Sequence, residues 1–346
     1  MVEKITYKIA TNEDYPAVLQ LYNKMYGAQR SLSDIEWMVD KNPAGKAVHF
    51  ISLMDNEVVG MQSLIPYYFV LDGVKTLTFK SEDSLIKKEL RGKGIFSKLY
   101  EMVHDYADGR LVWGLTDKKE ILERLKMPSS ERLTIAVSVK KPGLVKDKGG
   151  MQRSVVKTLY YSYLYLKSTF KSRTYTPKLE LSEIKAEDFE REKTSHFFDK
   201  LSKENPGIYY PQMDSDYLKW RLVSNPNFDS YKMFVSTNDQ GAITMCSLIG
   251  LQGKSAHWLS FYALNEMDED ERLAHISVLR KRLFDSGINM IHAWLFQCNE
   301  QTKKVKAHFL TSGFYAVREG LWIVHNSQEL DMDVHDLYFS GQLGIR

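Results

Sequence analysis

The sequence predicts an α+β fold (mixed α/β) built as two tandem domains, each a mixed, mostly antiparallel sheet flanked by helices. Three observations support this prediction. Helix-like and strand-like patterns follow one another along the 346 residues. A glycine-bearing turn joins a strand pattern to a helix pattern at residues 89–99. Short motifs of the first half return in the second half in the same order.

The first half opens with two short helical patterns. Thr11 can cap the first, with Asp14 three residues later. Ser33 and Glu36 are read as a capping box for the second, which Asn42-Pro43 ends. A capped pair of helices therefore precedes the first strands.

Strands and helices then alternate. Asp55-Asn56 and Asp72-Gly73 are typical hairpin turns, and Pro66 is read as the mark of a bulge. The expected strands are residues 46–53, 57–71, 74–86 and 111–115, and the expected helices are 96–106 and 120–126. The hairpins make most of this sheet antiparallel.

Three motifs are repeated along the chain. Trp37 precedes Asn42-Pro43 at the same spacing at which Trp220 precedes Asn225-Pro226. Residues 13–15 resemble residues 187–189, and residues 63–65 match residues 247–249. Duplication of one domain is the preferred interpretation, and chance similarity of two α/β domains is the alternative. The expected organisation is a domain at 1–145, a helical linker at 146–178 and a second domain at 179–346.

Composition sets mild limits. Hydrophobic residues make up 43% of the chain, and a net charge of +3 gives no reason to expect a nucleic-acid partner. Cys246 and Cys298 are the only cysteines, so neither a disulfide framework nor a metal site is expected. No apolar run approaches the roughly 18 residues of a membrane span. A cytoplasmic location is the expectation.

The turn at Arg91-Gly92-Lys93-Gly94 is the most informative motif. A turn that opens a helix offers N–H groups without internal partners, and the helix dipole adds positive potential there. Glycines let a pyrophosphate approach the backbone closely. The motif is neither G-x-G-x-x-G nor a Walker A loop. A plain basic turn with a helix cap is the alternative.

The same residues resemble the acetyl-CoA motif Q/R-x-x-G-x-G/A of the GNAT superfamily of N-acetyltransferases. The order of elements is similar to that family over residues 5–140 and more weakly over 180–328. The resemblance implies acetyl-CoA as co-substrate. It implies that the backbone of Leu85 and Ile86 pairs with the pantetheine arm. It also implies that the phosphates are held by Arg91, Gly92, Lys93, Gly94, Ile95, Phe96 and Ser97.

Catalytic groups are harder to assign. Glu82 and Asp83, on opposite faces of the strand that enters the loop, are the candidate bases; solvent-facing acids are the alternative. Tyr67, Tyr68 and Tyr210 are candidate substrate-binding residues or members of the core. The tyrosine that serves as acid in the family is replaced by Leu122 in the first copy and by Phe309 in the second.

The linker is basic and aromatic. Its segment 153–173 has helical spacing of valines, leucines and tyrosines. One interpretation is a surface helix that contacts anionic lipid; the other is a connector packed across both domains. The second copy replaces the glycine loop by the acidic run 264–273, so no coenzyme is expected there.

The sequence therefore predicts an acyl-CoA-dependent N-acetyltransferase, with an amine of a small molecule as acceptor. An amino sugar or natural-product intermediate is the first candidate, and a homodimer is compatible with the resemblance. A non-catalytic acyl-CoA-binding or scaffold protein is one alternative. A tRNA-dependent aminoacyl transferase of cell-wall type is the other, and the intact loop argues against it.

Overall fold

The computed structural model describes residues 4–27, 29–71, 74–116, 129–140, 151–171, 175–184, 191–226, 231–296 and 299–325. The chain forms two compact units. Unit 1 comprises Met1–Ser130, Tyr209–Pro226 and Trp322–Val334, and unit 2 comprises Glu131–Ile208, Asn227–Leu321 and His335–Arg346. Each unit thus takes segments from both halves of the sequence, whereas the sequence pattern predicted continuous domains.

The sheet of unit 1 is mostly antiparallel. Its strands lie in the order β1 (Ile5–Ile9), β2 (Val48–Met54), β3 (Glu57–Leu71), β4 (Val74–Ile86), β5 (Val112–Thr116), and then the end of β13 (Tyr315–His325). β4 and β5 are parallel, and the other neighbours are antiparallel. The short strand β8 (Tyr210–Pro211) pairs with β3 at Phe69 and Val70.

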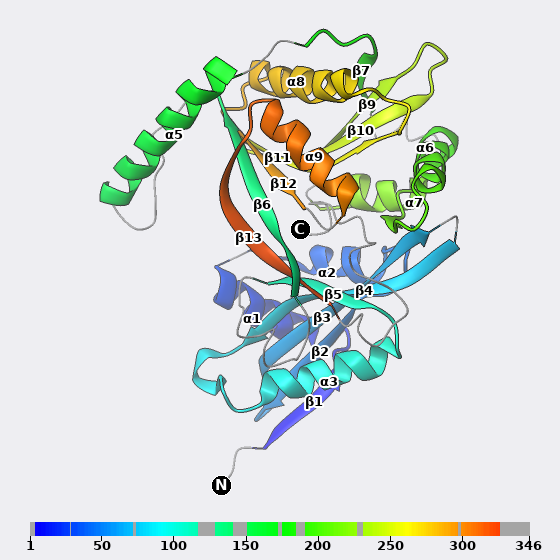
Figure 1. Cartoon of the computed structure of the whole chain (residues 1–346). Coiled ribbons are helices and arrows are strands. Elements are labelled where there is room, and N and C mark those ends of the chain that lie inside the picture. The colour runs from blue at the N-terminus through cyan, green and yellow to red at the C-terminus, as the bar shows by residue number, and fades with distance from the viewer. Residues whose placement is uncertain are drawn as a thin grey trace. The chain divides into compact units, whose positions relative to one another are not determined.

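Helices cover this sheet. They are α1 (Tyr15–Tyr26), α2 (Leu32–Val39), the 3-10 turn η1 (Lys88–Leu90), α3 (Ile95–Ala107), α7 (Ser215–Leu218) and the π-helical turn η3 (Lys219–Val223). Figure 1 shows α3 running along the sheet, where Leu99 and Val103 pack into the core with Phe50, Leu64 and Phe79. Burial of these apolar side chains fixes α3, and with it the loop before it.

Several local predictions can be compared with the structure. The Thr11 N–H donates to Asp14 Oδ2 at 2.8 Å, but the N-cap of α1 is Asp14, so the cap expected at Thr11 was wrong and this bond lies in the turn before the helix. Asp55 and Asn56 both have positive φ, as the predicted hairpin requires. Glu57–Leu71 and Val74–Ile86 have the predicted bounds. Residues 72–73 and the helix expected at 120–126 lie outside the described residues.

Two further local predictions were wrong. The capping box of α2 is formed by Ser31 and Asp34 rather than by Ser33 and Glu36; the Ser31 N–H donates to Asp34 Oδ2 at 2.7 Å. Ser31 is the residue with extended backbone, so the helix begins after it. Pro66 marks no bulge. The register with β4 is continuous there, and β2 pairs with β3 only as far as Leu64, so the missing N–H of Pro66 costs no bond to β2.

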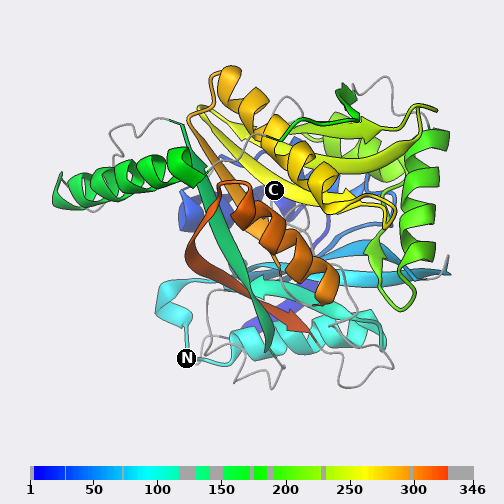
Figure 2. The same cartoon turned by 45° about the horizontal axis from the view of Figure 1, so that its top comes forward.

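Unit 2 repeats the element order. Its strands lie in the order β6 (Ser129–Val139), β12 (Met290–Leu295), β11 (Ser255–Ala263), β10 (Ile243–Gln252), β9 (Tyr231–Thr237) and β7 (Glu180–Ile184). β11 and β12 are parallel. Its helices are α5 (Met151–Lys171), α6 (Arg191–Glu204), α8 (Glu269–Asp285) and α9 (Glu300–Thr311). Figure 2 shows α8 and α9 over the sheet, where Ile276 and Phe309 bury Trp258.

The pairing of β6 and β13 explains why each unit contains segments from both halves of the sequence. β6 comes from the first half of the sequence but pairs with β12, from Leu295↔Thr134 to Met290↔Val139. β13 comes from the end of the second half, and its residues Trp322–His325 pair with β5. The two halves therefore exchange a strand, which no local pattern in the sequence indicates.

Candidate functional site

The edge of β4 is open next to β5. The two parallel strands pair only at Phe79↔Val112, Lys80↔Trp113 and Ser81↔Gly114. β4 continues to Ile86 and β5 to Thr116 without further pairs to each other among the described residues. Leu85 and Ile86 pair with β3 on their other side. An extended ligand that carries amide groups can therefore bind to β4 as an added strand.

A β-bulge lies in this open part of β4. The register with β3 shifts between Met61↔Leu85 and Ser63↔Glu82, and Asp83 has φ +56. The extra residue breaks the alternation of side chains. Asp83 Oδ2 lies 3.5 Å from the Ser63 Oγ, and Ser63 is the cross-strand partner of Glu82. The expectation that Glu82 and Asp83 lie on opposite faces was therefore wrong, because the bulge turns both toward the Ser63 face.

Asp83 is held in a buried ion pair. The Arg30 Nη1 donates to its Oδ2 at 2.7 Å, and the two side chains are only 10% and 5% exposed. Arg30 also donates to the Tyr22 hydroxyl at 2.9 Å and lies 3.7 Å from the centre of the Tyr22 ring. The Asn23 side chain bonds both backbone groups of Arg30. Helix α1 thereby fixes the charge partner of Asp83.

Glu82 is the more accessible of the two acids. Its side chain is 19% exposed and forms an ion pair with the Lys80 ammonium, which is 3% exposed. Lys80 and Glu82 are two residues apart on one strand and so share a face. A carboxylate that is ionised and reaches solvent can accept a proton from an amine.

Gln62 organises the other face of the bulge. Its Nε2 donates at 2.9 Å to the Ser81 Oγ, to the Glu82 carbonyl and to the Ser63 carbonyl. Ser84 donates to its side-chain oxygen. Gln62 is fully buried, so these bonds satisfy its amide and hold the irregular backbone in one conformation.

Tyr100 of α3 completes this network. Its hydroxyl lies 2.7 Å from the Ser81 Oγ. Burial raises the pKa of the Tyr100 phenol, so it stays protonated at neutral pH. No motif in the sequence had pointed to Arg30, Gln62 or Tyr100. A signal existed only for Gln62, as an uncharged polar residue inside an apolar strand.

The loop before α3 is shaped to receive an anion. Gly92 and Gly94 have φ of +83° and +79°, and there is open space where a side chain would stand. No side chain caps the α3 N-terminus, and residues 91–94 are exposed. The first N–H groups of α3 are thus not taken by a cap, at the positive end of the helix dipole. These residues fit a pyrophosphate.

The loop before α3 is held in place by contacts with the core and with the end of β4. Ile95 is buried in the core, and the Phe96 ring lies 5.0 Å from the Tyr100 ring. The Arg91 Nε donates to the Ile86 carbonyl at 3.4 Å, which ties the loop to the end of β4. Ile95 and Phe96 would therefore offer backbone groups, and not side chains, to a phosphate.

The three candidate tyrosines differ in burial. Tyr67 is 5% exposed and packs against Trp113, Tyr217 and Trp220. Tyr210 is 3% exposed on β8. Tyr68 is half-buried, with the Lys75 ammonium 4.3 Å from its ring centre. Core packing thus accounts for Tyr67 and Tyr210, and Tyr68 is the one more open to a ligand.

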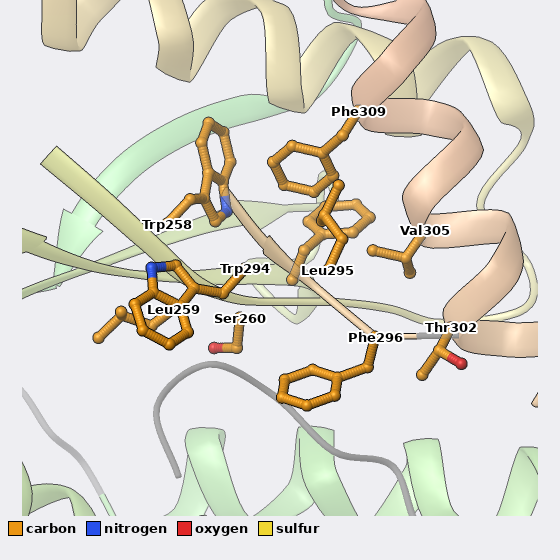
Figure 3. A pocket seen from close by; sticks show the side chains of 10 residues that line it. Trp258, Leu259, Ser260, Trp294, Leu295, Phe296, Thr302, Val305 and Phe309 are labelled. Atoms are coloured by element: carbon orange, nitrogen blue, oxygen red, sulfur yellow. The ribbon is translucent and has the colours of Figure 1, made fainter. Parts of the chain in front are cut away.

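Unit 2 has a corresponding divergence between β11 and β12, whose pairs end at Trp258↔Ala293. Figure 3 shows a small pocket there, which is lined by Trp258, Trp294, Leu295, Phe296 and Phe309. The cavity measures about 20 Å³, which is room for roughly one water molecule. A pantetheine arm does not fit in this volume.

The N-terminus of α8, unlike that of α3, is capped by a side chain and is followed by acidic residues. Asp268 caps α8 by accepting from the Glu271 N–H at 2.7 Å, and Glu269 and Asp270 follow in the first turn. These acids occupy and neutralise the positive end of the helix. Among the described residues, no group of three or more His, Cys, Asp or Glu side chains is arranged to hold a metal ion.

Comparison with known proteins gives similarity in structure only. No family model matches the sequence, and no curated protein matches it. A probable N-acyltransferase from Enterococcus faecalis, a conserved protein of unknown function, is 10% identical with a TM-score of 0.64; the match covers 93% of this chain and 72% of that one. A GCN5-related N-acetyltransferase from Anabaena variabilis is 8% identical with a TM-score of 0.63, over 93% and 72%.

A third similar structure is the N-myristoyltransferase of Saccharomyces cerevisiae with bound myristoyl-CoA. It is 10% identical with a TM-score of 0.57, and the match covers 94% of this chain and 83% of that one. Identities this low concern the fold alone. The matches show the fold: the chain has the fold of the GCN5-related N-acetyltransferases.

Proposed function

We propose that the chain is an acyl-CoA-dependent N-acyltransferase, with the coenzyme in unit 1 and an amine of a small molecule as acceptor. One observation carries the proposal: the open edge of β4 beyond Ser81 leads directly to the uncapped N-terminus of α3. An extended chain of amides that ends in a pyrophosphate matches this pair of features. The structural similarity to an N-myristoyltransferase with bound myristoyl-CoA supports an acyl-CoA ligand.

Each part of unit 1 has a task in this proposal. The N–H groups of residues 92–97 hold the pyrophosphate, and Arg91 and Lys93 add positive charge. The backbone of Leu85 and Ile86 pairs with the pantetheine amides. N–H groups of β4 at the bulge donate to the thioester carbonyl oxygen, where negative charge develops during attack.

Glu82 serves as the base. It takes the proton from the acceptor ammonium, so that the nitrogen lone pair can attack the thioester carbonyl carbon. The C–N bond forms and the C–S bond breaks, and the remaining excess proton of the attacking nitrogen passes through water to the departing thiolate, which leaves a neutral amide and a free thiol. Asp83 is assigned a positioning role, because its carboxylate is paired with Arg30 and only 5% exposed, whereas Glu82 is 19% exposed.

Acetyl is the first candidate for the acyl group, and an amino sugar or natural-product intermediate is the first candidate for the acceptor. A non-catalytic acyl-CoA-binding protein is the second function. The replacement of the family's tyrosine by Leu122 in the first copy, and the ion-paired state of Glu82, are the observations that favour it.

Thiol release from acetyl-, butyryl- and myristoyl-CoA, with and without a panel of amines, tests the proposal. We expect amine-dependent release for the wild type and for Glu36→Gln, a matched change of an exposed acid on α2. We expect strongly reduced release for Glu82→Gln. Coenzyme binding without release for any amine would favour the non-catalytic function. Absence of both would contradict the proposal.

A further inference from the structure

Helix α5 exposes a row of large apolar side chains. Val156 and Leu159 are each 66% exposed, and Tyr163 and Leu166 are each 56% exposed. At 100° per residue these positions, together with the exposed Val155 and Tyr160, fall in a sector of roughly 140° on one side of the helix. We call this set the α5 stripe; its members are Val155, Val156, Leu159, Tyr160, Tyr163 and Leu166.

The other side of α5 attaches the helix to unit 2. Leu164 is 4% exposed and packs with Val137 and Val139 of β6. The Tyr315 hydroxyl donates to the Lys167 carbonyl at 2.8 Å, and the Lys167 ammonium lies 5.3 Å from the Tyr315 ring centre. In Figures 1 and 2, none of the other drawn helices of unit 2 lies alongside α5. The side chains of the α5 stripe therefore do not take part in the packing that attaches α5 to unit 2.

The charge of α5 is of one sign. The helix contains Arg153, Lys157, Lys167 and Lys171 and no acidic residue. A second copy of α5 facing the stripe would bring together two sets of like charges, which disfavours self-association. Nucleic acid would match the charge, but its phosphates cannot bury valine and leucine side chains. A surface that is both apolar and anionic matches the stripe best.

We propose that the α5 stripe binds to the surface of a lipid bilayer that carries anionic headgroups. Valine and leucine side chains enter the boundary between headgroups and acyl chains, and tyrosines and basic residues lie at headgroup level. Within the described residues, no helix has the length and apolar character to cross a bilayer, so α5 lies on the surface. The basic residues make this binding sensitive to salt and to anionic lipid.

Flotation of the full chain with vesicles of phosphatidylcholine, with and without phosphatidylserine, tests this proposal. The variant Val156→Glu/Leu159→Glu changes the two most exposed members of the stripe. Its matched control is Leu32→Glu/Val74→Glu, which makes the same kind of change at exposed positions of unit 1. Circular dichroism and acetyl-CoA titration verify that each variant is folded and that unit 1 is unaffected; if the glutamates disturb folding, Val156→Ser/Leu159→Ser replaces them.

We expect the wild type and the control to float with phosphatidylserine vesicles, less so at high salt. The bound fraction of the stripe variant should fall at least tenfold. Equal flotation of the stripe variant, or a wild type that stays in solution, would overturn the proposal. A wild type that does not float, but whose mass by light scattering is that of two chains and falls to one in the stripe variant, would assign the stripe to a second copy instead.

Discussion

Trp37 and Trp220 form a reciprocal pair. Their rings stack with centres 4.7 Å apart at an interplanar angle of 14°. The Trp37 Nε1 donates to the Trp220 carbonyl at 2.8 Å, and the Trp220 Nε1 donates to the Trp37 carbonyl at 2.9 Å. The indole of each tryptophan thus donates to the backbone carbonyl of the other, which is the pattern expected across a two-fold axis. Both precede Asn-Pro at the same spacing in the sequence, so the contact supports a duplicated domain.

This pair should contribute strongly to the stability of unit 1. We expect Trp37→Ala to lower the free energy of unfolding by about 3–5 kcal/mol, since a buried ring is removed. Trp37→Phe keeps a ring but leaves the Trp220 carbonyl without its indole donor, and should cost about 1–3 kcal/mol. Urea unfolding of the full chain measures both. A decrease of less than about 1 kcal/mol in the unfolding free energy of the alanine variant would show that the pair contributes little to stability.

The Arg30–Asp83 ion pair should be important because it is buried. Arg30→Met leaves a carboxylate without its partner, and we expect a loss of about 3–5 kcal/mol in unfolding free energy. The double variant Arg30→Met/Asp83→Asn should recover part of this loss, because asparagine tolerates the positive φ of that position and carries no charge. A double-mutant cycle in urea measures the coupling. The control is Lys98→Met, which breaks the exposed pair with Glu101 and should leave stability unchanged.

Glu82 and Asp83 should differ in steady-state kinetics. If Glu82 is the base, Glu82→Gln should lower kcat by roughly 10²–10⁴-fold with little change in the KM for the coenzyme. Asp83→Asn should leave more activity, because its carboxylate is engaged by Arg30. The main effect of Asp83→Asn should be a lower free energy of unfolding. The reverse order of kcat values would transfer the catalytic role to Asp83.

His275 should make unit 2 sensitive to acid. Its ring is fully buried between the Ser236 and Ser247 hydroxyls, and burial, with a smaller effect of the nearby Arg282 charge, lowers its pKa to about 3. In the unfolded chain the pKa of His275 is about 6.5. Below that pH the imidazole is therefore protonated in the unfolded state but stays neutral in the folded state. Stability should therefore be complete above about pH 6.5 and should fall as the pH drops toward 3.

Urea unfolding at several pH values between 7.5 and 4 measures this dependence. The variant His275→Gln keeps hydrogen-bonding groups for the two serines but cannot take up the proton. Its stability should change less over this range than that of the wild type. Parallel profiles for the two proteins would show that His275 does not cause the acid sensitivity.

The elements that local patterns specify were predictable. β3, β4, the Asp55-Asn56 turn and the glycine loop each depend on neighbouring residues, and each was recognised in the sequence. The bulge at Asp83 was not, because it depends on a register set by β3 and on the bonds of Gln62. Arg30 lies 53 positions from its partner Asp83, and nothing in its own surroundings marks it. The exchange of β6 and β13 is a tertiary pairing for which the sequence carries no short-range signal.

Calorimetric titration with acetyl-CoA tests the coenzyme site most directly. The proteins are the wild type, the loop variant Arg91→Glu/Gly92→Asp, and the control Gly109→Asp/Arg110→Glu. The control makes the same changes, at an arginine and a positive-φ glycine, just beyond the opposite end of α3. We predict one site per chain in the wild type and the control, and no binding by the loop variant. No heat with the wild type, or unchanged binding by the loop variant, would contradict a coenzyme site at the start of α3.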